Sequence, residues 1–198
     1  MRELLIATTN KGKMREIKAL LAGMPFKITS LADYPDIPAV VEDGATFKSN
    51  ALKKALTVAR VTGTLTMGED SGLEIRALDN RPGVYSARFS GLLADDRKNN
   101  LKVLRLLRGV PADQRQARYR CCIALADGQG VVAVVSGSCA GSIAARARGT
   151  NGFGYDPLFL VPRYQKTFGE LDPAVKSRLS HRAKALKKLK ILLERYIN

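Results

Sequence analysis

Glycine and aromatic residues alternate in one short segment, Asn-Gly-Phe-Gly-Tyr-Asp-Pro at residues 151–157. The glycines let the backbone turn and approach a ligand, while Phe153 and Tyr155 offer ring faces for stacking. Asp156 supplies an acceptor, and the only histidine follows in Ser180-His181-Arg182, which adds cationic donors. This combination is typical of a site for a nucleotide base. A tight turn with core aromatics is the alternative.

Two adjacent acids, Glu69 and Asp70, follow a short apolar run and precede an alternating strand pattern. The sequence Gly-Glu-Asp-Ser-Gly at 68–72 therefore predicts a strand break that presents both carboxylates. Mg²⁺ takes oxygen ligands and binds through one or two carboxylates plus the phosphates of its substrate. Together with Glu42 these acids supply oxygens for such an ion, although Asp-Ser-Gly is also ordinary turn chemistry.

A polar turn follows the first apolar run of the chain, Leu-Leu-Ile-Ala at residues 4–7. Apolar residues then recur at helical spacing over 14–21, so the pattern predicts a strand, a turn and a helix. The N-terminus of such a helix favours an anion, and Lys11 and Lys13 add positive charge there. The turn lacks the glycine and hydroxyl residues of a Walker A loop at the required spacing. A phosphate site is therefore expected without that motif.

The helix that should follow Thr46 has an interrupted apolar face. Thr46 is a suitable N-cap, and residues 47–58 carry an apolar stripe that contains Asn50 and Lys54. Either these two polar side chains face a ligand, or Lys54 extends along the stripe to reach solvent.

The remaining patterns predict structural elements. They are a helix opened by Asp95 with Leu101, Leu104 and Leu107 inward, a hairpin of strands at 119–126 and 131–135, a strand near 142–144, and a C-terminal amphipathic helix carrying Leu186, Leu189, Leu193 and Tyr196.

Several enzyme classes are excluded by what the chain lacks. With one histidine, a Ser-His or Cys-His nucleophile would have to use His181, and no nucleophile elbow is present. The three cysteines, Cys121, Cys122 and Cys139, have no zinc or redox spacing and are expected to be reduced core residues. No Gly-x-Gly-x-x-Gly follows a strand. Metal-assisted chemistry on phosphates remains.

Length and charge limit the class of protein. A chain of 198 residues with 45% hydrophobic content fits a single domain over 1–198. No apolar run approaches the roughly 18 residues that span a bilayer, so a cytoplasmic protein with no membrane partner is expected. The net charge of +15 favours a polyanionic partner, and residues 163–198 hold ten Lys/Arg against three acids. A nucleic-acid-binding protein without hydrolysis is therefore the alternative function, weakened by the 6% aromatic content and by the acidic cluster.

Six separated segments together resemble the inosine triphosphate pyrophosphatase family, the non-canonical purine nucleoside triphosphate pyrophosphatases. The match spans nearly the whole chain: Ala-Thr-Thr-Asn-Lys-Gly-Lys at 7–13, Glu42 with Gly44-x-Thr46-Phe47 and residues 50–54, Glu-Asp-Ser-Gly-Leu at 69–73, Pro-Gly-Val-Tyr-Ser-Ala-Arg at 82–88, residues 152–157, and Lys176 with Ser180-His181-Arg182. The resemblance implies an α/β fold with an elongated central mixed sheet flanked by helices, two lobes around an active-site cleft, and a homodimer. It also implies Mg²⁺-dependent hydrolysis, with Mn²⁺ as a possible substitute, of ITP, dITP and XTP to the monophosphate and pyrophosphate.

The resemblance also implies roles for individual residues. Asp70 would activate the attacking water, and Glu42, Glu69 and Asp70 would hold the metal. The substrate-binding residues would be Thr8, Thr9, Asn10, Lys11, Gly12 and Lys13 at the triphosphate, Asn50 and Lys54 along the cleft, Ser71, and Phe153, Gly154, Tyr155, Asp156, Lys176, His181 and Arg182 around the base and phosphates.

Two positions depart from the family pattern. The usual Asp-Asp-Ser-Gly has Glu69 in place of its first Asp, and the usual Gly-Gly before the aromatic segment is Asn151-Gly152. The longer Glu69 side chain would alter the geometry of a metal that it bound directly.

Overall fold

The computed structural model describes residues 2–37, 40–91 and 95–197. Within these residues seven strands form one sheet in the order β2-β1-β3-β4-β5-β6-β7, in which β1 pairs with β2 and β3 in parallel and β6 pairs with β5 and β7 antiparallel. The sheet is therefore mixed, as expected. The strands are β1 Arg2–Ile6, β2 Phe26–Ser30, β3 Thr66–Ile75, β4 Gln116–Asp127, β5 Gly130–Ile143, β6 Phe159–Val161 and β7 Lys166–Thr167.

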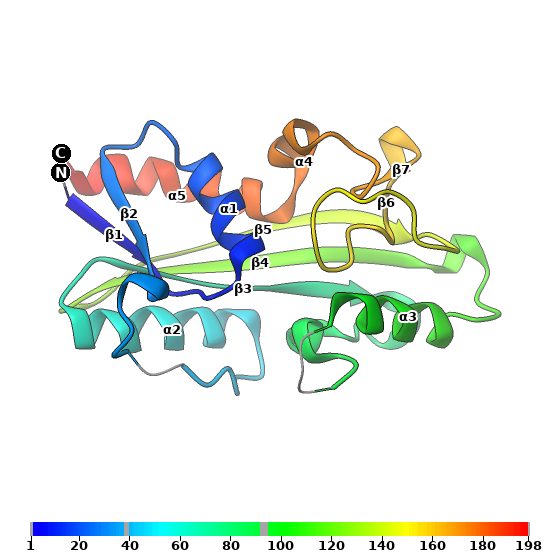
Figure 1. Cartoon of the computed structure of the whole chain (residues 1–198), viewed down its shortest axis with the longest axis horizontal. Helices are drawn as coiled ribbons and strands as arrows, with labels where there is room; N and C mark the ends of the chain where they lie inside the picture. The colour runs from blue at the N-terminus through cyan, green and yellow to red at the C-terminus, as the bar shows by residue number, and fades with distance from the viewer. Residues whose placement is uncertain (1, 38–39, 92–94, 198) are drawn as a thin grey trace. The chain divides into compact units, whose positions relative to one another are not determined.

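In the described part of the chain, the α-helices that flank the sheet (Figure 1) are α1 Lys11–Leu20, α2 Phe47–Thr62, α3 Asp96–Leu106, α4 Pro173–Leu179 and α5 His181–Ile197. Short 3₁₀ segments lie at Leu31–Asp33, Arg76–Leu78, Gly83–Arg88, Ala112–Gln114 and Pro162–Tyr164. In the described part of the chain, no helix is both long enough and apolar enough to cross a membrane.

The chain divides into two compact units, which agrees with the two lobes that the resemblance implies. Unit 1 comprises residues 1–70, 121–137 and 182–198, and unit 2 comprises residues 71–120 and 138–181. Strands β3, β4 and β5 each contribute residues to both units.

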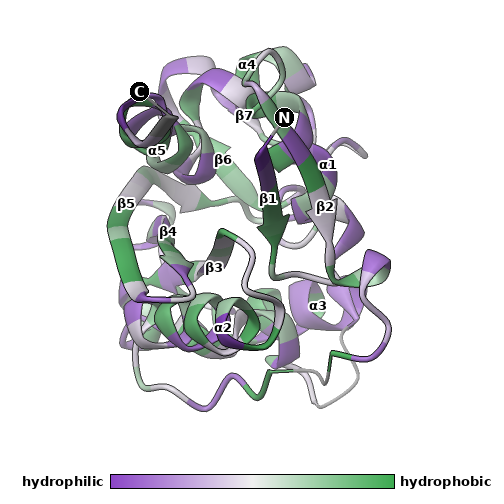
Figure 2. Cartoon of the chain, turned by 90° about the vertical axis from the view of Figure 1, so that its left-hand side faces the viewer, coloured by the Kyte–Doolittle hydropathy of each residue, from purple (hydrophilic) through white to green (hydrophobic). Residues whose placement is uncertain are grey.

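Unit 1 has helices on both faces of its strands (Figures 1 and 2). Successive residues of a strand point to opposite faces, and Leu4 and Ile6 of β1 pack in one apolar cluster with residues of α1 and α5. Leu5 and Ala7 pack in another cluster with Val58 of α2. The unbroken apolar run at 4–7 therefore marks a strand buried on both faces.

Unit 2 has its own apolar core. Leu73 and Ile75 of β3, Tyr119 of β4 and Phe159 of β6 pack there with Val103 of α3. The helix begins after the N-cap Asp95, whose carboxylate accepts from the backbone N–H of Lys98 at 2.9 Å.

Three predictions about the elements are wrong in detail. Residues 68–72 do not break the strand, because β3 runs without interruption from Thr66 to Ile75. The strand expected near 142–144 is the end of β5, which is 14 residues long. Leu101 points outward with 57% of its surface exposed, whereas Val103 and Leu107 are fully buried.

The glycine that suggested a turn in β3 has a packing role instead. A Cβ on Gly68 would lie 2.2 Å from the backbone oxygen of Ala51 and 2.6 Å from the nitrogen of Ala55. Gly68 therefore lets α2 approach the strand closely. This brings the polar residues of α2 toward the acids of β3.

Candidate functional site

The predicted phosphate turn of unit 1 leads into a capped helix. Asn10 is the N-cap of α1, and its Oδ1 accepts from the backbone N–H of Lys13 at 2.9 Å. Thr8 Oγ1 accepts from the N–H of Asn10 at 3.2 Å, and Thr9, Asn10 and Lys11 are exposed. Polar side chains thus surround a helix N-terminus, an arrangement that suits an anion.

Asp70 lies buried in the middle of β3 beside α2. Its Oδ2 accepts from Asn50 Nδ2 at 2.9 Å, and Asn50 Oδ1 accepts from the N–H of Gly44 at 2.7 Å. Burial raises the pKa of Asp70 to about 6, against the opposing pull of Lys13 and Lys54. A carboxylate with this pKa is ionised at neutral pH and still accepts a proton readily.

Lys54 does not extend to solvent. Its side chain is 7% exposed, and Nζ lies 2.9 Å from Oε2 of Glu42. The interruption in the stripe of α2 is therefore a buried polar layer, in which Asn50 contacts Asp70 and Lys54 contacts Glu42. Of the two explanations for this stripe, the one in which Lys54 reaches along it to solvent is wrong.

Glu69 is held between two cations. Its Oε2 lies 2.7 Å from Lys13 Nζ, and its Oε1 accepts from Arg182 Nη2 at 3.0 Å. Burial would raise the pKa of Glu69, but the charges of Arg182, Lys13 and Lys54 outweigh that effect and hold it well below the usual range. Cys121 Sγ donates to the same carboxylate at 3.3 Å. Arg182 also pairs with Glu16.

Unit 2 gathers the aromatic segment around Asp156. The carboxylate of Asp156 pairs with Lys176 Nζ and accepts from the N–H of Phe153 at 2.9 Å. Lys176 Nζ lies 4.8 Å from the centre of the Phe153 ring, which is a cation–π distance. Tyr119 donates to Asp156 through a long hydrogen bond of 3.5 Å and stacks on His181 with ring centres 4.6 Å apart.

Phe153 and Tyr155 differ in their surroundings. Tyr155 is 4% exposed, packs in the core of unit 2 and donates through its hydroxyl to the backbone oxygen of Ser86 at 2.7 Å. It anchors the segment, and Phe153, which is only partly buried, is the ring that can offer a face to a ligand. Gly152 has φ +80°, and a Cβ there would lie 1.9 Å from Asp156 Oδ2, so this position requires glycine.

The predicted residues thus form two groups, one in each unit. Unit 1 brings together Lys13, Asn50, Lys54, Glu69, Asp70 and Arg182 with Glu42, and it also contains Thr8, Thr9, Asn10, Lys11 and Gly12 at the start of α1. Unit 2 brings together Phe153, Asp156 and Lys176, and it also contains Gly154, Tyr155, His181 and the partly buried Ser71.

Three residues with contacts in these groups were missed by sequence reasoning: Glu16, Tyr119 and Cys121. Glu16 lies three residues after Lys13, which places it on the same side of α1, so its spacing was a usable signal. Tyr119 and Cys121 are inward residues of an alternating strand and resemble ordinary core positions in the sequence.

The carboxylates fit a magnesium ion in part. No group of three or more His, Cys, Asp or Glu side chains within residues 2–37, 40–91 and 95–197 is arranged to hold a metal. Asp70 and Glu42 nevertheless offer hard oxygen ligands, and a bound cation would offset the free-energy cost of burying the Asp70 charge. Mg²⁺ needs only one or two carboxylates when phosphates supply the rest. Both Glu69 oxygens already face cations.

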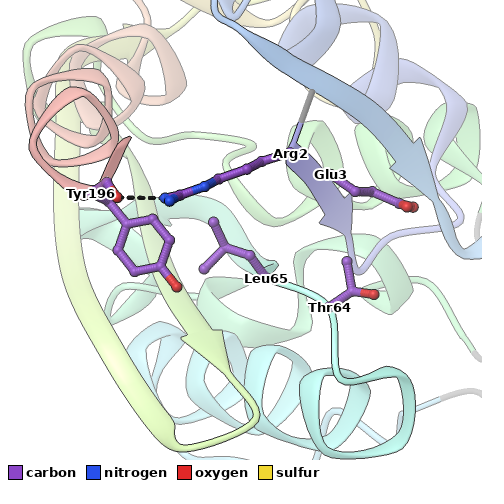
Figure 3. Close-up of a pocket in the computed structure, with 5 residues that line it drawn as sticks. All are labelled: Arg2, Glu3, Thr64, Leu65 and Tyr196. Carbon is purple, nitrogen blue, oxygen red and sulfur yellow. Dashed lines mark hydrogen bonds between the residues drawn. The ribbon is translucent and has the colours of Figure 1, made fainter. Parts of the chain in front are cut away.

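A pocket elsewhere in unit 1 contains none of the predicted residues. It is lined by Arg2, Glu3, Thr64, Leu65 and Tyr196 and has a volume of about 400 Å³. Figure 3 shows Arg2 extending toward Tyr196, whose backbone oxygen accepts from Arg2 Nη1 at 2.7 Å. Glu3 is engaged by the hydroxyls of Thr29 and Tyr34. The polar groups of this pocket are largely paired with the protein itself.

Comparison with known proteins identifies relatives along the full chain. The profile of the Ham1 family matches residues 4–192. A dITP/XTP pyrophosphatase of Desulforamulus reducens is 51% identical over 193 residues, covering 98% of this chain and 96% of that protein. A dITP/XTP pyrophosphatase of Geobacter sulfurreducens is 51% identical, with 96% of each chain covered.

A solved structure gives the same result for the fold. The HAM1 protein from Coxiella burnetii superposes with a TM-score of 0.89 at 38% identity, covering 98% of this chain and 100% of that one. Both the sequence relatives and this structure extend over both units. The chain therefore belongs to the Ham1 family.

Proposed function

We propose that this chain hydrolyses the non-canonical purine nucleoside triphosphates dITP, XTP and ITP to the monophosphate and pyrophosphate. The observation that carries the proposal is the polar layer of unit 1. There a buried Asp70 with a pKa of about 6 accepts from Asn50, close to the Lys54–Glu42 pair and to Lys13. The names of the relatives, dITP/XTP pyrophosphatase, support the same reaction.

Asp70 takes the role of general base. It accepts a proton from a water molecule that attacks the α-phosphorus, and pyrophosphate leaves as the α–β bond breaks. Lys54 and Lys13 offset the negative charge that develops on the phosphates. Lys13 is already oriented by Glu69. Burial would lower the pKa of Lys13, but the charge of Glu69 outweighs that effect and raises it, so Lys13 stays charged.

A magnesium ion, or manganese in its place, would be held by Asp70 and Glu42 and would supply charge neutralisation and orientation of the triphosphate. Glu69 has a different role in this scheme. It is the buried counter-ion of Lys13 and Arg182, and the extra methylene relative to the family's usual Asp lets one carboxylate reach both cations.

The residues of unit 2 would recognise the base. Phe153 offers a ring face to the base. Asp156 accepts from the backbone N–H of Phe153 and Lys176 lies over its ring, and these two contacts fix the orientation of the ring. A 6-keto purine presents an acceptor where adenine presents a donor, so donors such as His181 or a backbone N–H favour hypoxanthine and xanthine over adenine.

The wider context follows from the substrate. An enzyme that removes non-canonical nucleotides from the precursor pool would work in the cytoplasm, and a homodimer is expected by resemblance. The nucleic-acid-binding alternative rests on the net charge of +15 and on the stacking aromatics, whereas the two similar bacterial proteins are named as enzymes.

One experiment tests the reaction. The protein is incubated with ITP, XTP, dITP, GTP, ATP and CTP plus Mg²⁺, and pyrophosphate and orthophosphate are quantified separately. Pyrophosphate from ITP, XTP and dITP with little from ATP is expected. Orthophosphate alone, or no turnover with Mg²⁺ or Mn²⁺, would overturn the proposal. Light scattering on the same preparation tests the dimer.

A further inference from the structure

Helix α3 holds the aromatic segment of unit 2 at one residue, Gly154, through the two peptide groups that flank its Cα. The N–H of Gly154 donates to Asp96 Oδ2 at 2.7 Å, and its backbone oxygen accepts from Asn100 Nδ2 at 2.9 Å. Asp96 and Asn100 are one helical turn apart and therefore lie on the same side of α3. Helix α3 thus binds both the backbone N–H and the backbone oxygen of Gly154. More than fifty residues of the chain separate Gly154 from these two helix residues.

The same helix also holds the 3₁₀ segment at 83–88 and the residues after it. Asn99 is 2% exposed, and its amide accepts from the N–H of Ser90 at 2.7 Å and donates to the oxygen of Ala87 at 3.1 Å. Lys102 Nζ donates to the oxygen of Phe89. Two side chains along α3 thereby fix a second backbone segment through its own polar groups.

The two segments held by α3, at residues 87–90 and at Gly154, are also linked by a hydrogen bond next to them. Tyr155, the residue after Gly154, donates to the backbone oxygen of Ser86, which immediately precedes Ala87. A closed circuit of hydrogen bonds therefore runs from α3 to Gly154, through Tyr155 to Ser86, and back to α3 through Asn99. Such a circuit restricts the backbone between Phe153 and Tyr155, since neither segment can move without breaking hydrogen bonds to a regular helix.

The position of Gly154 depends on its hydrogen bonds to Asp96 and Asn100. Its φ is +63°, a left-handed conformation, and nothing lies within 4 Å of where a Cβ would be. No contact on that side holds the residue, whereas the hydrogen bonds to Asp96 and Asn100 fix both of its backbone polar groups.

We infer that Asp96 and Asn100 are positioning residues that set the geometry of the base-binding segment without touching the substrate. The inference deepens the proposed function and rests on it, because the segment at 152–156 must bind the base for its position to affect selectivity. Loss of the hydrogen bonds from Asp96 or Asn100 to Gly154 lets Phe153 sample other orientations, which weakens base binding. The groups of unit 1 that break the phosphoanhydride are unchanged.

The test uses Asp96→Ala and Asn100→Asp, with Asp96→Asn as the conservative variant that keeps an acceptor. An aspartate side chain has nearly the shape of Asn100 but cannot donate when ionised. Arg105→Ala is the matched control, because Arg105 is an exposed residue of the same helix. The first readout is amide exchange at Gly154 by NMR in the free protein, which is independent of catalysis. We expect roughly tenfold faster exchange in the first two variants and no change in the control.

The second readout is steady-state kinetics with ITP. A roughly three- to tenfold rise in KM with kcat within about twofold of wild type is expected for Asp96→Ala and Asn100→Asp, in line with the loss of one hydrogen bond. Asp96→Asn should restore much of the loss. Selectivity for ITP over ATP should fall by a similar factor.

The outcomes separate the two proposals. Unchanged exchange at Gly154 in both variants overturns the positioning role, whatever the kinetics. Faster exchange with an unchanged KM shows that the segment does not set base binding and overturns the functional part of the inference. If the wild type hydrolyses none of the nucleotides, the proposed function fails and this inference fails with it, even where the exchange readout shows that α3 holds Gly154.

Discussion

Asp70 combines burial with a negative charge, and this makes it both reactive and unfavourable for stability. Its folded pKa of about 6 lies above the ordinary value of 3.8. A carboxyl group with a raised pKa contributes stability that is complete below the ordinary value and is lost as the pH rises through the folded value. At pH 7 the ionised Asp70 therefore destabilises the fold.

Replacing Asp70 by Asn should separate these two effects. We expect Asp70→Asn to lose at least about a hundredfold in kcat, because the proposed general base is removed. The same variant should be more stable than wild type by on the order of 2 kcal/mol at pH 7 without metal, and the gain should vanish near pH 4. The amide oxygen of the new side chain can still accept from Asn50, so that contact survives. Urea titrations at pH 4, 5.5 and 7 in EDTA measure the trend; near-wild-type turnover or a pH-independent difference would contradict it.

Variants of Glu69 test whether its carboxylate binds a metal ion or serves as the counter-ion of Lys13 and Arg182. Glu69→Gln removes the carboxylate that pairs with Lys13 and leaves the buried Arg182 with Glu16 as its remaining partner, so we expect a loss of about 3–5 kcal/mol in the free energy of unfolding. Glu69→Asp keeps the charge and restores the family's usual residue, so it should fold. Its apparent affinity for Mg²⁺, read from activity against metal concentration, should stay within about threefold of wild type. A tenfold change in that affinity would instead make Glu69 a metal ligand.

At the scale of elements, β3 and α2 form the pair that builds the polar layer, and Gly68 is the point where they touch. We expect Gly68→Ala to destabilise the protein by about 1–3 kcal/mol, because the added methyl group collides with the backbone of α2. The displaced helix carries Asn50 and Lys54, so kcat should fall as well. Gly128→Ala is the control, since nothing lies within 4 Å of a Cβ there. Equal stability of the two variants in thermal unfolding would show that α2 adjusts freely.

The elements also show what local patterns can and cannot predict. The helix after Thr46 and the C-terminal helix were predictable because caps and apolar stripes are local signals. The continuous β3 was not, because Gly68 reads as a turn residue when the neighbouring helix is unknown. The inward Lys54 left two explanations open, and its burial beside Glu42 excludes the one in which it reaches solvent. The residue types of the site were thus predictable, but their pairing depends on contacts between elements.

The departure at Asn151 is resolved at the same scale. The family's usual glycine there is not required, because the backbone of Asn151 does not have a positive φ. Asn151 Nδ2 donates to the oxygen of Leu171 at 3.0 Å, and its N–H donates to the oxygen of Gly169 at 3.0 Å. Gly152, in contrast, is held to glycine by its φ of +80° and by the carboxylate of Asp156. A sequence pattern alone does not tell these two positions apart.

For the whole molecule, the net charge of +15 has a consequence for stability rather than for the fold. Much of the basic excess near the C-terminus lies on the solvent side of α5, where Lys184, Lys187 and Lys188 are exposed. Like charges on a surface repel one another, and this repulsion is screened as the Debye length falls from about 30 Å at 0.01 M salt to about 8 Å at 0.15 M. The pairs buried around Glu69 are screened much less.

The thermal unfolding midpoint should therefore rise by a few degrees between about 10 and 150 mM NaCl at pH 7. Chloride is the anion of choice, because phosphate or sulfate could bind the proposed triphosphate site and stabilise the fold by mass action. A double variant, Lys184→Gln with Lys187→Gln, lowers the exposed charge and should show a smaller rise. An unfolding midpoint that falls with salt would contradict this prediction. It would mean that attractive ion pairs on the surface contribute more to stability than the repulsion between the lysines of α5 takes away.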